Sequence, residues 1–322
     1  MRIFIAGGSG AIGRLLVPLL VGSGHHVTAL TRSPQRAQTL ERMGAAAVVG
    51  DVYDAETLTR SIGSSGAELV MHQLTAFGTT DGDPYAETMR IRIEGTRALV
   101  SAARQAGVRR MITQSISFMC SPTGTGFTDE DTPLYVDGPA GAGALAKAVA
   151  SLEQQTLDAY PEAAIVLRYG WFFGPGTSYD PNDAIPNGLR AGTLPIAGSG
   201  AGNYSFIDLR DAARATVKAV THEASGIFNI VDDTAVCLRE FLPAMATLLG
   251  APQPQTMSEA VALEKFGDLR VYYWNEQRPA SNAKAKSSSG GSRGSRCGRK
   301  ASRSCTQRAM LAENTAARRM RS

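Results

Sequence analysis

The sequence has few cysteines, no long apolar run and no leader-like start. Its four cysteines, Cys120, Cys237, Cys297 and Cys305, show no metal-ligand spacing. No apolar run approaches the roughly 20 residues that span a bilayer. The chain runs from Met1 through one short apolar segment into a glycine turn, without the pattern of a signal peptide. We therefore expect a cytoplasmic protein with no membrane segment, no metal site and no disulfide framework.

The C-terminal tail lacks the residues that build a core. Residues 284–322 contain no Val, Ile, Phe, Tyr or Trp, and they carry eleven Lys and Arg against one acid. Subtraction from the totals of 33 and 29 leaves 22 bases and 28 acids in residues 1–283. Such a segment cannot offset its ordering entropy by burial, so we expect disorder. Either the reading frame shifts near Lys286, or the tail is a genuine basic extension; we expect no nucleic-acid partner.

The first 170 residues alternate short apolar runs with longer amphipathic stretches. The predicted strands are Arg2–Ala6, His26–Leu30, Ala46–Gly50, Ala67–His72, Arg110–Gln114 and Ala164–Arg168. The predicted helices between them are Ala11–Val21, Pro34–Met43, Ala55–Ile62, Tyr85–Ala106 and Ala142–Ala159. This alternation predicts βαβ units, and hence an α/β fold with a doubly wound parallel sheet.

The rhythm breaks after Arg168. An aromatic run, Trp171-Phe172-Phe173, leads into a loop-rich stretch, and strand and helix patterns return only after Asn203. We expect residues 171–283 to form a smaller C-terminal lobe, interleaved with the core, over the carboxyl edge of the sheet. The aromatic run lines a substrate pocket or packs between the lobes; the sequence leaves both open.

A glycine-rich turn follows the first predicted strand. Gly7, Gly10 and Gly13 stand at the spacing that lets a chain turn tightly, approach a pyrophosphate and pack a helix closely on a strand. The helix N-terminus supplies amide donors to the phosphates. This pattern indicates a Rossmann-like dinucleotide-binding domain over residues 1–170. The expected cofactor-binding residues of the turn are Gly7, Ser9, Gly10, Ala11, Ile12 and Gly13.

The end of the second strand indicates which dinucleotide binds. An Asp or Glu there would hold the ribose hydroxyls of NAD, but this chain reads Thr31-Arg32-Ser33. The planar guanidinium of Arg32 suits the 2′-phosphate of NADP. We therefore expect NADP(H) to be preferred, with NAD still possible.

Further motifs carry a resemblance to a known family. Gly50-Asp51-Val52, residues 173–177 and residues 206–213 follow the glycine turn in a characteristic order. Over residues 1–283 the chain resembles the atypical members of the extended short-chain dehydrogenase/reductase family, which are related to NAD-dependent epimerase/dehydratases. The resemblance implies that Asp51 and Val52 contact the adenine and that Leu74 and Thr75 pass the ribose and nicotinamide.

The resemblance also implies a catalytic set, which this sequence matches incompletely. The family uses Tyr-x-x-x-Lys on the helix after the fifth strand, with a Ser or Thr that orients the substrate carbonyl. Lys147 sits at the expected lysine position, where the resemblance implies that it holds the nicotinamide ribose. Gly143 takes the place of the tyrosine, and Ser115 or Ser117 matches the serine. Tyr135, Tyr169 and His72 are possible substitute acids, and no spacing favours one of them.

These observations favour an NAD(P)-dependent oxidoreductase or epimerase acting on a small carbonyl, alcohol or sugar-like substrate. The missing tyrosine keeps two alternatives open, a non-catalytic dinucleotide-binding regulator and a non-redox lyase or isomerase. The long helices over residues 85–106 and 142–159 are where relatives pair, so a homodimer is possible.

Overall fold

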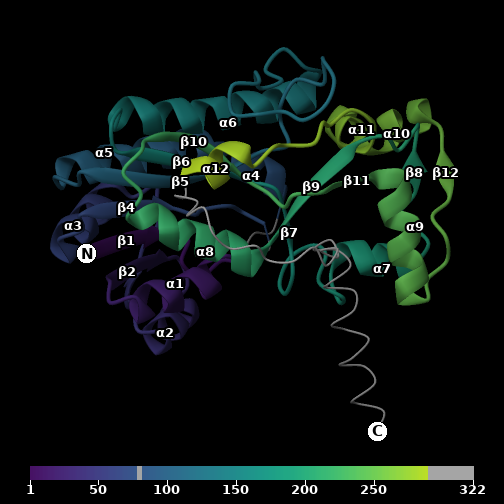
Figure 1. Cartoon of the computed structure of the whole chain (residues 1–322). Coiled ribbons are helices and arrows are strands. Elements are labelled where there is room, and N and C mark those ends of the chain that lie inside the picture. Colours follow the sequence, from purple (N-terminus) through teal and green to yellow (C-terminus); the bar gives the residue numbers. More distant parts are fainter. Residues whose placement is uncertain (78–81, 289–322) are drawn as a thin grey trace, which may run out of the picture.

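The computed structural model describes residues 1–77 and 82–288 of the chain. This part of the molecule has two bodies, a sheet covered by helices on both faces and a smaller lobe beside it (Figure 1). The chain passes from one body to the other more than once, because strands of the main sheet occur both before and after segments of the lobe.

Seven parallel strands form the central sheet, in the order β10-β6-β5-β4-β1-β2-β3. The strands are β1 (Arg2–Ala6), β2 (His26–Thr31), β3 (Ala46–Val49), β4 (Leu69–His72), β5 (Arg110–Ile116), β6 (Ala164–Tyr169) and β10 (Gly226–Ile230). The chain order reverses between β1 and β4, which is the switch point where open α/β sheets bind ligands. The predicted α/β class and doubly wound parallel sheet are confirmed.

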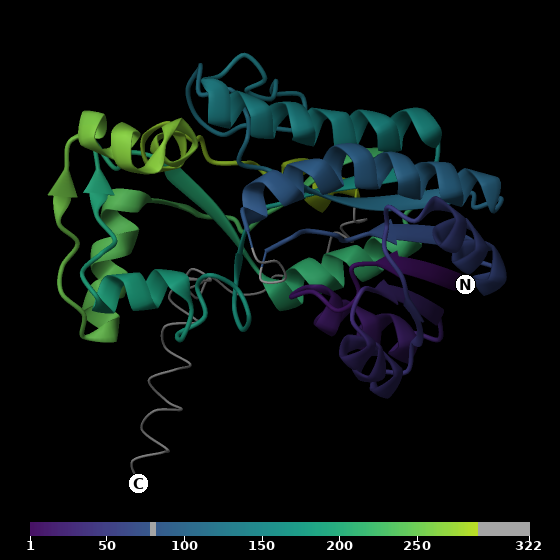
Figure 2. The same ribbon diagram turned by 180° about the vertical axis from the view of Figure 1, so that it is seen from behind.

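Helices cover both faces of this sheet (Figures 1 and 2). One layer consists of α1 (Gly13–Gly22), α2 (Pro34–Arg42) and α8 (Leu209–Val220). The other consists of α3 (Ala55–Ser65), α5 (Thr96–Gln105) and α6 (Ala140–Ala159). Apolar faces of both layers pack on the strands in two separate clusters, for example through Leu16 on one side and Leu58 on the other. Burial on both faces explains why the strands read as continuous apolar runs.

The segment expected to be one helix over residues 85–106 is interrupted. It consists of α4 (Pro84–Arg90), a π-helical turn η1 (Ile91–Gly95) and α5. The Thr96 hydroxyl donates to the carbonyl of Ile91, five residues earlier, at 3.4 Å. A π turn inserts one extra residue into a helix and is frequent at functional sites.

The smaller lobe has its own sheets and its own core. Its strands are β7 (Trp171–Phe173), β9 (Asn203–Asp208) and β11 (Ala235–Cys237) in one sheet, and β8 (Ile196–Ala197) with β12 (Thr256–Met257) in another. Its helices are α7 (Ala184–Arg190), α9 (Leu238–Leu249), α10 (Glu259–Phe266) and α11 (Asp268–Asn275). Phe206, Phe241 and Trp274 belong to the apolar cluster that holds these elements together.

The lobe and the core are interleaved. Strand β10 pairs with β6 at the edge of the main sheet, and α8 packs against α1. Residues 209–230 therefore belong to the core, inside the range expected for the lobe. After α11 the chain returns to the core as α12 (Ala283–Ser288), which packs on β10.

The expected start of the disordered tail is wrong by a few residues. Lys284 lies in α12 with its ammonium nitrogen 5.0 Å from the ring centre of Phe228. The remainder of the expected tail, residues 289–322, lies outside the described residues. The two alternatives for this segment, a shifted reading frame and a genuine basic extension, therefore stay predictions. Within the described ranges no helix is both long and apolar enough to cross a membrane, and no group of acids, His and Cys is placed to hold a metal.

Candidate active site

A cavity of about 1180 Å³ lies at the carboxyl edge of the main sheet. Its walls come from the glycine turn, the ends of β2, β4, β5 and β6, and the lobe elements β7, β9, α9 and α11. This is the place at which parallel sheets present their loops to ligands. The volume exceeds the usual range for one drug-sized ligand, so a dinucleotide and a small second molecule can both fit.

The glycine turn forms one end of the cavity. Gly7 has a φ of +99°, and a Cβ there would lie 2.4 Å from the carbonyl oxygen of Gln73. Gly10 lines the cavity and has nothing closer to its Cβ position than 3.4 Å, so its bare backbone is open to a ligand. A Cβ on Gly13 would lie 2.3 Å from the carbonyl oxygen of Gly8. Gly13 therefore brings α1 close to the turn and does not itself line the cavity.

Two arginines that line the cavity follow β2, one directly after the strand and one in the first turn of α2. Arg32 and Arg36 both line the wall beside the glycine turn. The Ser33 hydroxyl accepts from the amide of Arg36 at 3.3 Å and so caps α2. This cap fixes Arg36 one helical turn after the strand. The sequence predicted Arg32 and missed Arg36, although an arginine in the first turn of the next helix was a visible signal.

The remaining expected dinucleotide contacts also line the cavity. Asp51 and Val52 lie beyond the glycine turn, and Leu74 and Thr75 follow β4. The Asp51 carboxylate accepts from the amide of Tyr53 at 3.0 Å, which holds the loop in place. The structure thus brings all of the predicted cofactor residues except Gly13 and Lys147 to one surface.

His72, weighed as a substitute acid, is a satisfied core residue. Its Nε2 lies 3.0 Å from the Thr96 hydroxyl, and its Nδ1 accepts from the amide of Leu74 at 3.3 Å. Burial, with a smaller contribution from the charge of Arg92, lowers the pKa of His72 from 6.5 to about 4. The ring is therefore neutral at pH 7 and holds the loop that begins at Leu74.

Both predicted serines point away from the cavity. Side chains alternate along β5 and its extension, so Gln114, Ile116 and Phe118 line the cavity while Ser115 and Ser117 do not. Ser115 donates to a carboxylate oxygen of Glu153 at 2.6 Å in the buried interior. Neither serine lines the cavity, where Ile116 occupies the facing position, so their role on a substrate carbonyl stays a prediction that this geometry does not favour.

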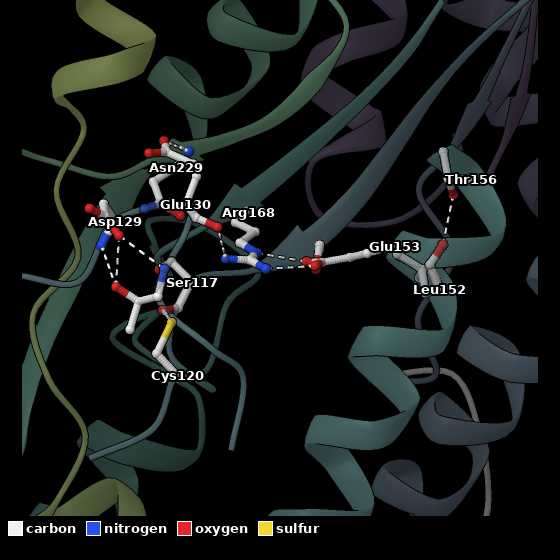
Figure 3. Close-up of polar contacts among 11 residues, drawn as sticks. Ser117, Cys120, Asp129, Glu130, Leu152, Glu153, Thr156, Arg168 and Asn229 are labelled. Carbon is white, nitrogen blue, oxygen red and sulfur yellow. Dashed lines mark hydrogen bonds and ion pairs between the residues drawn. The ribbon is translucent and has the colours of Figure 1, made fainter. Parts of the chain in front are cut away.

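The interior behind β5 is a structural network. Glu153 of α6 accepts two hydrogen bonds from Arg168 of β6, each at 2.7 Å, and both side chains are almost fully buried. Arg168 also donates to the backbone carbonyl of Glu130, whose carboxylate accepts from the amide of Asn229 (Figure 3). The network ties α6, β6 and β10 together, and it uses the groups that Ser115 contacts.

This geometry does not favour the predicted role of Lys147 either. Lys147 lies on the exposed face of α6 and does not line the cavity. The residue of α6 that does line it is Leu145. Two positions on a helix correspond to a rotation of about 200°, which carries Lys147 to the opposite side. The tyrosine position expected at Gly143 is closed as well, since a Cβ there would lie 2.6 Å from the carbonyl oxygen of Gly138.

Gly141 has no room for a tyrosine. A Cβ at this position would lie 2.5 Å from a carboxylate oxygen of Asp268. The same carboxylate accepts from the amides of Gly141 and Ala142 at 3.0 Å, which satisfies the start of α6. An acidic residue of the lobe thus fills the space beside the start of α6.

Aromatic rings dominate the other half of the cavity. Phe118 and Trp171 stack with centroids 4.0 Å apart and planes 16° from parallel, and Tyr273 meets Trp171 edge-on at 4.9 Å. All three line the cavity. The aromatic run at Trp171 therefore does both things that the sequence left open, since it lines the cavity and joins the lobe to the core.

Three of the tyrosines that line the cavity, Tyr169, Tyr204 and Tyr273, are deeply buried and poor proton donors. Burial raises the pKa of Tyr169, and it raises those of Tyr204 and Tyr273 well above their usual value. The Tyr169 hydroxyl is also 2.6 Å from that of Thr216, away from solvent. Tyr135, the other candidate acid, does not line the cavity.

Arg92 is a cavity residue that the sequence analysis missed. It lies on the π turn, is only 5% exposed and lines the cavity. In the described part of the chain its guanidinium has no hydrogen-bond or ion-pair partner. Desolvation lowers its pKa from 12.5 to about 10, so it stays charged at pH 7. The signal available in the sequence was that Arg92 stands four residues after Thr88 and four before Thr96, which puts all three on one side of a helix. Both threonines are buried.

With fold and cavity established, the class is a dinucleotide-binding α/β protein with a substrate lobe. The profile of the NAD dependent epimerase/dehydratase family matches residues 3–231. The chain belongs to the NAD dependent epimerase/dehydratase family. The predicted resemblance and the predicted general function, an oxidoreductase or epimerase-like protein of small substrates, are confirmed at this level.

Individual relatives differ in chemistry. A Streptomyces protein named 3-diazoavenalumate denitrifying reductase is 40% identical over 294 residues, 90% of this chain and 95% of that protein. A Mycolicibacterium smegmatis UDP-glucose 4-epimerase is 28% identical over 287 residues, 84% of this chain and 88% of that protein. The relatives thus include both a reductase and an epimerase.

Solved structures share the fold. UDP-glucose 4-epimerase of Thermotoga maritima with UDP-glucose superposes with a TM-score of 0.69 at 20% identity, over 89% of this chain and 92% of that one. A Bordetella bronchiseptica enzyme in complex with NAD and UDP gives 0.69 at 21% identity, over 90% and 88%. At these identities the likeness establishes the architecture.

Proposed function

We propose that this protein is an NADP(H)-dependent reductase whose substrate accepts a hydride without a proton from the protein. One observation carries the proposal. The wall of the cavity formed by β5 and α6 presents the aliphatic side chains of Ile116 and Leu145, and neither Ser115 nor Lys147, which were expected to relay a proton, lines it. A family member that keeps its dinucleotide cradle and its aromatic cavity, and lacks this proton relay, suits a different electron acceptor.

The cofactor cradle supports dinucleotide binding. The open backbone at Gly10 and the amides at the start of α1 fit a pyrophosphate, and Arg32 with Arg36 fits a 2′-phosphate. A bound NADPH would supply the hydride. The buried Oε1 of Gln114 has no hydrogen-bond partner and lines the same cavity, so an additional donor can be accommodated there.

The balance of the reaction distinguishes the acceptors. Reduction of a carbonyl to an alcohol consumes one hydride and one proton, so it benefits from a positioned acid. Conversion of an arenediazonium ion to the arene and N₂ consumes one hydride and no proton, and the C–N bond breaks as N₂ leaves. The reductase from Streptomyces is named for a denitrifying reduction of a diazo compound, and it matches this chain over nearly its whole length.

The test is a matched pair of acceptors. NADPH oxidation is followed with 4-carboxybenzenediazonium and with 4-carboxybenzaldehyde, each against a heat-inactivated control. We expect protein-dependent oxidation with the diazonium ion and none above background with the aldehyde. Equal or faster reduction of the aldehyde would overturn the proposal and would leave a carbonyl reductase with a proton donor outside β5 and α6.

A second candidate is favoured by the same wall of the cavity. A dinucleotide-binding regulator also needs the residues that bind the dinucleotide but needs no proton-donating side chains. The lack of such side chains at Leu145 and Gly141 therefore agrees with this function. Tight NADPH binding without consumption of any acceptor, diazonium ions and nucleotide sugars included, would favour this alternative. The non-redox lyase or isomerase has no observation of its own in its support.

A homodimer through α5 and α6 stays a prediction. Sedimentation equilibrium of the purified protein across a tenfold range of concentration tests it. A single species at the dimer mass is expected, and a single species at the monomer mass would contradict it.

A further inference from the structure

We propose that Arg92 binds the carboxylate of an aromatic acid in the cavity and thereby selects the substrate. The inference rests on the proposed function only in taking the cavity as the substrate site. Arg92 is 5% exposed, yet it lines the cavity on the π turn η1. A guanidinium this deeply buried is normally paired, because an uncompensated buried charge is costly.

Among residues 1–77 and 82–288, no side chain forms an ion pair with Arg92. The nearest acid that interacts with Arg92 electrostatically is Glu153. Both carboxylate oxygens of Glu153 are already bonded to Arg168, and one of them also accepts from Ser115. The charge of Arg92 therefore has only the cavity to face, and an anion that enters the cavity would neutralise it.

The surroundings of Arg92 define what the anion is attached to. Tyr273 interacts electrostatically with Arg92 and also meets Trp171 edge-on, while Phe118 stacks on Trp171. These rings form an aromatic wall of the cavity, in which Phe118 and Trp171 are stacked and Tyr273 is edge-on. A planar aromatic or conjugated body fits such a wall, and a carboxylate fits the two-pronged donor face of the arginine.

A carboxylate is favoured over a diphosphate by the number of charges available. Arg270 is the other arginine in the lobe half of the cavity, and it lies over the Trp274 ring at 5.9 Å. Because Arg270 is already placed over an aromatic ring, the proposal assigns the ligand to the guanidinium of Arg92, whose charge one carboxylate neutralises. The retained positive charge would also draw an acidic molecule into an otherwise apolar cavity.

The experiment compares an acid with its neutral amide. Binding of cinnamate and of cinnamamide to the full chain saturated with NADP⁺ is measured by calorimetry. Arg92→Gln removes the charge, Arg92→Lys keeps it without the planar fork, and Arg97→Gln is the matched control on the exposed face of the same helical segment. Affinity for NADPH is measured separately in every variant by its fluorescence.

We expect the wild type and Arg97→Gln to bind cinnamate at least about tenfold more tightly than cinnamamide. Arg92→Gln should lose that preference while binding the amide and NADPH as before, and Arg92→Lys should retain part of it. An equal affinity of the wild type for acid and amide would overturn the proposal. So would a preference that survives in Arg92→Gln, or dependence on Arg92 for UDP-glucose and not for cinnamate.

The two proposals fail in different ways. Loss of NADPH binding in the wild type would contradict the proposed reductase and leave the acid preference measurable in the dinucleotide-free protein. Failure of the acid preference with normal NADPH binding would contradict only the role of Arg92.

Discussion

Single residues decide what the cavity can do. Arg92 brings into it a buried charge with no ion-pair partner among the described residues, and Ile116 and Leu145 present aliphatic side chains on the wall formed by β5 and α6. Each is a local departure from what burial or the family would dictate. Departures of this kind concentrate at functional sites, where stability is exchanged for binding or chemistry.

Arg92→Met should stabilise the ligand-free protein. The change removes a buried charge whose pKa desolvation lowers from 12.5 to about 10, and it keeps most of the apolar stem. A gain of about 1–3 kcal/mol in the free energy of unfolding is expected, measured by urea titration. A loss of similar size would mean that the guanidinium holds the fold and is not reserved for a ligand.

His72 should make stability depend on pH in a defined window. Burial lowers the pKa of His72 in the folded protein to about 4, below the ordinary histidine value of 6.5, so the unfolded chain binds a proton more readily. The stabilisation is complete above pH 6.5 and is lost as the pH falls toward 4, by up to about 3 kcal/mol. His72→Gln should lose less stability than the wild type over this range; identical pH profiles would contradict the assignment.

Secondary-structure elements were predictable where the pattern was strong. The first strand was predicted with its observed bounds, Arg2–Ala6. Helix α6 begins at Ala140, only two residues before the predicted start. The π turn was not predictable, because the sequence there reads as an ordinary helix with an apolar face. The predictions for the site failed where they depended on the direction of a side chain. A shift of one residue along β5 puts the side chain on the other face of the strand, and a shift of two residues along α6 turns the side chain away from the cavity.

Lys147→Met tests the orientation of α6. Because Lys147 lies on the outer face, we expect NADPH affinity and turnover to change by less than about twofold, as for other surface substitutions. Fluorescence titration and steady-state rates provide the two values. A tenfold loss in either value would indicate that Lys147 contacts the cofactor ribose, which would contradict the observed orientation of α6.

The start of α2 should set the choice of dinucleotide. Arg32→Ala and Arg36→Ala should each weaken NADPH by about tenfold, since each removes a charged donor to the 2′-phosphate, and should leave NADH nearly unchanged. Arg42→Ala, at the exposed far end of the same helix, is the control. Equal losses for both dinucleotides would argue that these arginines do not distinguish them.

At the scale of the whole molecule, the lobe and the core make the site together. The dinucleotide cradle belongs to the core, whereas Trp171 and Tyr273 come from lobe elements and Arg92 from the core helix beneath them. The sequence analysis expected two parts with interleaved segments, although it assigned residues 209–230 to the lobe. It could not predict which side chains of two separate bodies would face one another, because that depends on the packing of α6 against α11.

The central claim is that hydride transfer here proceeds without a proton from the protein. The most direct measurement uses ¹⁵N-labelled 4-carboxybenzenediazonium, with NADPH oxidation and labelled N₂ release recorded together in H₂O and in D₂O. The account predicts one N₂ per NADPH consumed and the same rate in both solvents. NADPH consumption without N₂, or a clear slowing in D₂O, would contradict it.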